Sequence, residues 1–460
     1  MDIDKGLTAL SVLDGRYARL TAGLNEVFSE CGLMKHRVFV EIQWLVFLSR
    51  ELGLMVLDEE QTSEVKAIAD HFTPRDAARI KEIEKGTNHD VKAVEYFIKE
   101  RLSSSGMASV KEWVHFACTS EDINNTAYAL MLKKGRALIR EQIGRLLEIL
   151  ETYGEAYKAI PMMARTHGQP ASPTTIGKEF INFAWRIREE LDQLMQIPIQ
   201  AKMNGATGNF NAHDFVFPNV DWIGASERFL STYLDLQPLL YTTQINPYHY
   251  VSRTFHAMIR IASVTVDLDR DMWGYVSLGY FKQKLKAGEI GSSTMPHKVN
   301  PIDFENSEGN MGIAISMMEH LAVKLLNSRF QRDLTDSTVL RNMGAIFGYF
   351  QIGLLNAIKG LEKLDIDHST LQQDLDENVE LLAEPIQTAM RVFGEENPYE
   401  RLKELTRGKK ISREELREFT DRMDRFPEDI KTKIQRIRVE QYTGLATRLV
   451  DRYLSDHQGQ

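Results

Sequence analysis

Apolar residues recur at helical spacing through long parts of this 460-residue chain. The first such segment covers about 27–54, and its apolar face is made by Val38, Ile42, Leu45 and Leu48. A second covers 59–71, and a third begins at Thr73-Pro74, where the threonine suits an N-cap and the proline suits the first helical position. The pattern predicts an array of helices.

Three long tracts contain no proline: residues 75–160, 248–295 and 302–384. Because proline inside a helix costs about 3 kcal/mol, such tracts permit helices of unusual length. Helical spacing persists in all three, through Ile139, Ile143, Leu146 and Leu150 in the first, Ile261, Val264, Leu268, Met272 and Tyr275 in the second, and Ile313, Met317, His320, Leu321 and Leu325 in the third, which continues towards Phe347 and Ile352. We expect an all-α protein in which these helices pack as a bundle.

The length exceeds what one compact core usually holds. We predict an N-terminal helical domain over 1–111, a central domain of long helices over 112–364, and a C-terminal helical domain over 365–460, where the composition changes. Segments 259–266 and 311–318 are apolar on more than one face, so partner subunits are expected to cover the remaining apolar surface.

Composition and charge exclude several classes of protein. A net charge of −9 argues against a general nucleic-acid binder, although a few arginines can still make one cleft positive. Cys31 and Cys118 are the only cysteines, too few for a disulfide framework or a cysteine zinc site. No apolar run approaches the roughly 20 residues that span a bilayer, and the first residues lack a basic-then-apolar signal, so a cytoplasmic protein without membrane contact is expected.

Several polar loops precede predicted helices. In 86–90, Asn88 or Asp90 can cap the next helix, and His89 can be an ordinary surface histidine. Segment 118–122 allows a simple capping box, and 165–171 precedes a helix expected near 173–175. The glycine-rich segment 202–213 is not followed by Gly-Lys-Ser/Thr, which disfavours a Walker-type nucleotide loop.

The loop 288–301 is the richest in chemical groups. It combines flexible glycines, hydroxyls and donors, namely Gly288, Gly291, Ser292, Ser293, Thr294, His297 and Lys298. The histidines of the chain are scattered without a metal-ligand spacing, and no Gly-x-Ser-x-Gly elbow surrounds the serines. Proton transfer combined with anion binding remains, and we expect neither a metal nor another cofactor.

Residues 288–301 also resemble the Ser-Ser-x-Met-Pro-x-Lys-x-Asn-Pro signature of the fumarase/aspartase superfamily, and His297 points to its adenylosuccinate lyase family. Six further segments resemble that family in the same order: 14–17, 87–90, 119–122, 165–169, 242–244 and 332–338. The resemblance implies the three-domain superfamily fold, a central bundle completed by tetramerisation, and active sites shared between subunits.

The resemblance further implies β-elimination of fumarate from adenylosuccinate, which gives AMP, and from succinylaminoimidazole-carboxamide ribotide. Such a reaction requires loss of a weakly acidic C–H proton, support for the dianionic carboxylate that forms, and a proton for the leaving nitrogen. By this resemblance Ser292 is the base and His167 the acid. An imidazole suits the second task because it titrates near neutrality.

Substrate-binding roles are likewise implied by the resemblance. The succinyl carboxylate is assigned Lys298 and Asn300. The nucleotide end, chiefly the phosphate, is assigned Arg16, Tyr17, Arg332, Ser337 and Arg341. The rest of the cleft is assigned Asn88, His89, Asp90, Thr119, Ser120, Gln244, Ser293 and Asn306. Four further residues are assigned to substrate binding: Val299, Thr338, Val339 and Leu340.

Two other hypotheses stay open at this point. A different superfamily member, such as an argininosuccinate or aspartate lyase, is disfavoured by residues 295–298 and by the arginines of the nucleotide end. A non-catalytic scaffold on the same fold is disfavoured because it has no physical need for both His167 and Ser292.

Overall fold

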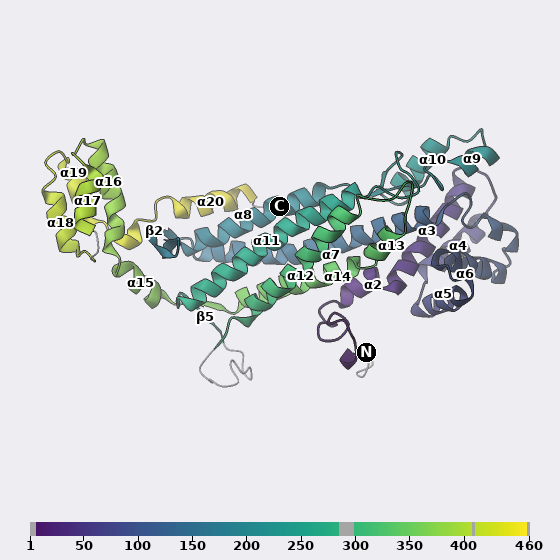
Figure 1. Ribbon diagram of the computed structural model, residues 1–460, viewed down its shortest axis with the longest axis horizontal. Coiled ribbons are helices and arrows are strands. Elements are labelled where there is room, and N and C mark those ends of the chain that lie inside the picture. Colours follow the sequence, from purple (N-terminus) through teal and green to yellow (C-terminus); the bar gives the residue numbers. More distant parts are fainter. Residues whose placement is uncertain (1–5, 285–298, 407–409, 458–460) are drawn as a thin grey trace. The chain divides into compact units, whose positions relative to one another are not determined.

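The computed structural model describes residues 6–284, 299–406 and 410–457 (Figure 1). Contacts divide the chain into two compact units. Unit 1 comprises residues 1–143, 190–263 and 309–355, and unit 2 comprises 144–189, 264–308 and 356–460. The domain boundaries expected from the sequence, at 111/112 and 364/365, stay a prediction.

The prediction of an all-α protein is confirmed, since helices make up most of the described chain. The helices of the N-terminal part are α2 (Ala22–Phe28), α3 (Glu30–Arg50), α4 (Glu59–Asp70), α5 (Pro74–Thr87), α6 (Asp90–Ser104) and the 3₁₀ helix η1 (Ala108–Trp113). The middle contains α7 (Ser120–Ala156), α8 (Ile176–Gln196), α9 (Asn211–Val216), α10 (Trp222–Arg228), the π-helix η2 (Phe229–Tyr233), α11 (His249–Ser277), α12 (Ile302–Lys324), α13 (Thr335–Leu340) and α14 (Met343–Glu362). The C-terminal part contains α15 (His368–Asp376), η3 (Val379–Leu382), α16 (Ala383–Val392), α17 (Pro398–Thr406), α18 (Arg413–Asp421), α19 (Glu428–Arg436), η4 (Val439–Gln441) and α20 (Ala446–His457).

Short strands form three two-stranded sheets within the described residues. The strands are β1 (Pro161–Thr166), β2 (Gln169–Thr175), β3 (Gln200–Ala201), β4 (Gln237–Pro238), β5 (Phe281–Gln283) and β6 (Leu364–Ile366). The pairs β1–β2 and β5–β6 are antiparallel, and β3–β4 is parallel. The helix expected near residues 173–175 therefore begins later, at Ile176, because β2 pairs through Thr175.

Unit 1 is built around α3, with α4 and α6 packed against it (Figure 1). The core here includes Val38, Ile42, Phe97 and Ile98, all at most 1% exposed. A single helix over 27–54 was expected, and it is interrupted at Ser29. This residue has an extended backbone, and its hydroxyl accepts a hydrogen bond from Gly32 N at 3.1 Å, so it ends α2 and caps α3.

The α4 and α5 predictions are confirmed at their starts. Asp58 caps α4 with a complete capping box, and Pro74 is the first residue of α5 after Thr73. The Asp76 carboxylate accepts hydrogen bonds from both the backbone N–H and the hydroxyl of Thr73, at 2.9 and 2.7 Å. These local polar contacts fix where both helices begin.

The long proline-free tracts form the long helices α7, α11, α12 and α14. The third tract does not form one continuous helix, because residues 325–334 leave the helical path after α12. Phe330 there has a left-handed backbone, and Asp333 accepts hydrogen bonds from the N–H groups of Arg329 and Thr335. These side-chain contacts stabilise a turn that positions α13.

Unit 2 contains a second core. Helices α16 to α19 gather around Leu375, Ile386, Met390 and Met423, which are buried (Figure 1). The β1–β2 hairpin contributes Met163 to this cluster. Among the described residues, no helix is both long and apolar enough to cross a membrane.

Candidate active site

Unit 1 brings together the polar residues near α13. Arg332 precedes α13, and its Nη1 donates a hydrogen bond to Gln244 Oε1 at 3.0 Å. Its Nη2 lies 3.7 Å from Glu121 Oε2, on the first turn of α7. Residues from three distant parts of the sequence therefore meet around one guanidinium, which we call the Arg332 cluster.

Glu121 is the most buried acid of the Arg332 cluster, with 2% of its surface exposed. It accepts a hydrogen bond from the Tyr248 hydroxyl at 2.6 Å. Burial, followed by the nearby Asp336 carboxylate, raises the pKa of Glu121 to about 7, although Tyr248 and Arg332 act in the opposite direction. The Arg332 cluster therefore contains a carboxyl that titrates near neutral pH.

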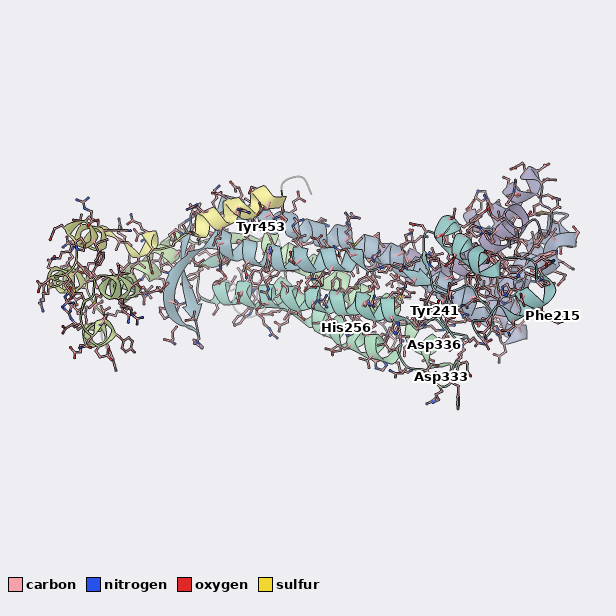
Figure 2. All side chains as sticks on the ribbon, turned by 90° about the horizontal axis from the view of Figure 1, so that it is seen from above. Phe215, Tyr241, His256, Asp333, Asp336 and Tyr453 are labelled. Carbon is pink, nitrogen blue, oxygen red and sulfur yellow. The ribbon has the colours of Figure 1, made fainter. Side chains whose placement is uncertain are left out.

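Two acids lie at the start of α13, Asp333 in the turn before the helix and Asp336 in its first turn, and their pKa values are shifted in opposite directions (Figure 2 shows their positions). Hydrogen bonds from the Thr335 hydroxyl and N–H lower the pKa of Asp333 to about 2. Asp336 is 5% exposed, and burial raises its pKa. The start of α13 is thus held by a charged turn, and the buried Asp336 adds negative potential beside Glu121.

The proton on Glu121 makes stability depend on pH. The pKa of Glu121 is about 7 in the native chain, and that of an ordinary glutamate is 4.5. Between pH 4.5 and 7 the native state therefore keeps a proton on Glu121 that the unfolded state has already released. This contribution is complete below pH 4.5 and is lost as the pH rises through about 7. We expect the free energy of unfolding of the unaltered chain to fall as the pH rises through this range. The fall should be on the order of 3 kcal/mol larger than the fall seen in Glu121→Gln.

Urea unfolding of both proteins at a series of pH values measures this difference. Asp58→Asn, at an exposed helix cap, serves as a control whose pH dependence between 4.5 and 7 should follow that of the unaltered chain. Parallel curves for the unaltered chain and Glu121→Gln would contradict the raised pKa.

A second cluster surrounds Asp90, the first residue of α6. Its Oδ2 accepts hydrogen bonds from Arg37 Nη2 at 2.8 Å and from Arg341 Nη2 at 2.9 Å. Arg341 also pairs with Glu30 at 2.9 Å, and Arg37 Nε donates to Asn124 Oδ1 at 2.9 Å. Burial alone would raise the pKa of Asp90, but Arg37 and Arg341 outweigh it and lower that pKa. This Asp90 cluster ties α3, α6 and α7 to the end of α13.

The residues before Asp90 have capping roles. Asn88 has a left-handed backbone and ends α5. The cap of α6 is His89, contrary to the suggestion of Asn88 or Asp90, and its Nδ1 accepts a hydrogen bond from Lys92 N at 3.2 Å. Both Asn88 and His89 remain exposed, so this cap does not prevent contact with a ligand.

The remaining predicted residues of unit 1 vary in exposure. Arg16 is exposed and its guanidinium lies 5.9 Å from the ring centre of the half-buried Tyr17. Thr119 N donates to Asp122 Oδ2 at 2.8 Å, and Ser120 begins α7. On α13, Ser337 and Val339 are half-buried, Thr338 is exposed and Leu340 is 2% exposed. The Leu340 side chain is buried in the interior. A ligand at this position would therefore contact the backbone of Leu340 and not its side chain.

In unit 2, His167 lies exposed at the tip of the β1–β2 hairpin. Thr166 pairs with Gln169, so His167 and Gly168 alone form the turn, with φ angles of 55° and 73°. Two successive residues with positive φ are typical of a type I′ turn, whose backbone twist matches that of the two strands it joins. Val299, Asn300 and Asn306 are half-buried, and Ser292, Ser293 and Lys298 lie outside the described residues.

Sequence reasoning missed five contributors to these clusters: Glu30, Arg37, Glu121, Asn124 and Tyr248. A signal existed for Arg37, because a charged residue beside Val38 in an apolar helix needs a buried partner. Glu121 lies in segment 118–122, where the pattern predicted only an acidic residue in the first turn of a helix. The contact of Tyr248 with Glu121 joins residues 127 positions apart, which no local pattern indicates.

Comparison with known proteins places this arrangement in a family. Residues 15–315 match the lyase family model, and residues 328–443 match the model of the adenylosuccinate lyase C-terminal region. Adenylosuccinate lyase of Vibrio cholerae is 50% identical over 451 residues, which cover 97% of this chain and 99% of the relative. The chain belongs to the adenylosuccinate lyase family. Adenylosuccinate lyase of Escherichia coli is 49% identical over 450 residues, covering 97% and 98% of the two chains.

Solved structures agree on the fold. A fumarate lyase from a Mesorhizobium species superposes with a TM-score of 0.77 at 18% identity, covering 94% of this chain and 97% of its own. The 3-carboxy-cis,cis-muconate lactonizing enzyme of Pseudomonas putida gives 0.74 at 18% identity, covering 95% and 97%. The predicted superfamily fold is confirmed, and membership of the adenylosuccinate lyase family makes this chain a carbon–nitrogen lyase.

Proposed function

We propose that the protein cleaves adenylosuccinate to AMP and fumarate. We propose that it also cleaves succinylaminoimidazole-carboxamide ribotide to aminoimidazole-carboxamide ribotide and fumarate. The main support is the near-complete coverage of adenylosuccinate lyases at about half identity. The family motifs also occur in order along the sequence. A purified sample should release fumarate from adenylosuccinate and not from argininosuccinate, and the reverse preference would contradict the proposal.

In the proposed reaction two groups move protons. Ser292, as an alkoxide, takes the proton from the carbon beside the succinyl carboxylate. The electron pair of that C–H bond forms the carbon–carbon double bond of fumarate, and the C–N bond breaks. His167 as imidazolium gives a proton to the departing nitrogen, which leaves uncharged, as the amino group of AMP or as the carboxamide nitrogen of the ribotide product.

The electrostatic roles follow from the charges of the assigned residues. Lys298 and Asn300 stabilise the dianionic carboxylate that develops in the transition state. Arg332 and Arg341 hold the phosphate end, with Arg16, Tyr17 and Ser337 beside them. Arg332 is suited to this task because Gln244 and Glu121 orient its guanidinium, while its Nε has no hydrogen-bond partner among the described residues.

Arg332→Ala should therefore weaken substrate binding. We expect KM for adenylosuccinate to rise by roughly 10- to 100-fold, the effect of losing charge-assisted hydrogen bonds, while kcat changes less than about threefold. Steady-state kinetics measures both values. Arg329→Ala is the matched control, since that side chain is 78% exposed and should leave KM unchanged. A fall in kcat without a change in KM would instead place Arg332 at the reacting bond.

We further propose a cytoplasmic homotetramer with active sites shared between subunits. Large apolar side chains on the long helices support an oligomer: in unit 1 Ile313 and Val323 are 46% and 60% exposed, and in unit 2 Trp185 and Trp273 are 51% and 47% exposed. Burying these side chains against further copies would remove apolar surface from water. Analytical ultracentrifugation should give four chains per particle, and a monomer would contradict this assembly.

A further inference from the structure

Unit 1 contains a cavity of about 580 Å³ formed by α3, α4, α7 and the chain after η2. Its size falls within the range of small-molecule sites. None of its lining residues belongs to the Arg332 or Asp90 cluster. The wall combines apolar side chains, Phe39, Leu130 and Leu234, with the lysines Lys35 and Lys134. An apolar surface with a few charged groups is the composition expected of a ligand site rather than of a packing defect.

His36 provides an unsatisfied polar atom in this wall. The side chain is 3% exposed, and its Nδ1 lies 2.7 Å from the carbonyl oxygen of Gly32, one turn earlier in α3. A carbonyl can only accept, so Nδ1 must carry the hydrogen and Nε2 must present a lone pair. That Nε2 is itself buried and has no hydrogen-bond partner among the described residues, so it does not face the open space of the cavity. Burial and the charge of Lys134 lower the pKa of His36 to about 4, which keeps the ring neutral at pH 7.

The lysines of the wall carry positive charge that the chain does not neutralise. Lys133 pairs with Asp235, but no ion pair engages Lys35 or Lys134 within the described part of the chain. Partial burial and the positive charge of Lys35 lower the pKa of Lys134. Asp70 is the single carboxylate in the lining, and it is exposed. An added anion would relieve this repulsion.

We propose that this cavity binds a small organic anion that has a flat apolar body. The anionic group lies between Lys35 and Lys134, and the apolar body lies against Phe39, Leu130 and Leu234. The site is separate from the residues assigned to the lyase reaction, so its occupant need be neither substrate nor product.

The probe 1-anilinonaphthalene-8-sulfonate has both features, namely a sulfonate and a flat apolar body of aromatic rings. Titration calorimetry with the full-length protein should give one saturable site per chain. In Lys35→Ala/Lys134→Ala we expect affinity to fall by roughly tenfold or more, because two charge-assisted contacts are lost. Ala137→Trp places an indole in the cavity from an exposed position on its wall and should abolish binding.

Matched controls separate this site from general adsorption of the probe. Lys433→Ala and Ala78→Trp alter exposed positions of α19 and α5 and should bind as the unaltered chain does. The uncharged N-phenyl-1-naphthylamine, which lacks the sulfonate, should bind at least about tenfold more weakly. Absence of a saturable site, equal affinity for both probes, or unchanged binding in both cavity variants would overturn the proposal. Thermal unfolding confirms that the variants are folded.

Discussion

His167→Asn is expected to lower kcat for adenylosuccinate by about a thousandfold, within the range for loss of a general acid. Asparagine cannot supply the proton that the leaving nitrogen needs at neutral pH. It does tolerate the left-handed backbone that His167 adopts at the hairpin tip, so the turn should persist. Fumarate release, followed by its ultraviolet absorbance, measures the effect.

The same variant should remain folded and assembled. The His167 side chain is exposed, and substitution at such positions usually changes stability by no more than about 0.5 kcal/mol. His368→Asn is the control, because it alters an exposed histidine at the start of α15 in the same unit and should retain full turnover. If His167→Asn kept more than about a tenth of the turnover, His167 would not be the proton donor. Loss of assembly would instead assign it a structural role.

Asp122→Asn is expected to cause the largest loss of stability, about 3–5 kcal/mol in the free energy of unfolding. Asp122 and Lys202 are both fully buried, with Oδ1 and Nζ 3.0 Å apart. The carboxylate also accepts hydrogen bonds from the N–H groups of Thr119, Asn204 and Gly205. Asparagine keeps an acceptor oxygen but not the negative charge, so the buried Lys202 ammonium is left without a counter-ion; its other acceptor is the Gly205 carbonyl, at 2.9 Å.

Urea unfolding at fixed protein concentration measures this loss. Asp235→Asn is the matched control, because its ion pair with Lys133 lies at the surface and should contribute at most about 1 kcal/mol. The double variant Asp122→Asn/Lys202→Met removes both charges and should recover a large part of the loss. A cost below about 1 kcal/mol for Asp122→Asn would mean that water reaches Lys202.

Much of the fold could be predicted because long helices leave two local marks, apolar spacing and absence of proline. Those marks anticipated α4, α7 and α11. They could not show that Ser29 interrupts a predicted helix, because the apolar spacing continues on both sides of its cap. The hairpin at 161–175 was missed because its strands lack the regular alternation of apolar and polar residues: Met162 and Met163 are adjacent and both buried in β1, and β2 contains two prolines.

The candidate site was predictable in its residues but not in its contacts. Family motifs named Gln244, Arg332 and Arg341, all of which lie in the two clusters of unit 1. They did not indicate that Glu121 would be the buried acid beside Arg332, because burial depends on tertiary packing. The proton-transfer roles of His167 and Ser292 stay predictions, and the kinetics of His167→Asn test the first of them.

The division of the chain into two units has a consequence for how the protein can be cut. Every boundary between the units lies inside a helix: α7, α8, α11, α12 or α14. Separating the units would therefore require severing five hydrogen-bonded backbones in mid-helix and leaving unsatisfied N–H and C=O groups at each end. We therefore expect neither unit to fold when it is expressed alone, and we expect insertions and circular permutations to be tolerated in the loops at the helix ends rather than within the helices.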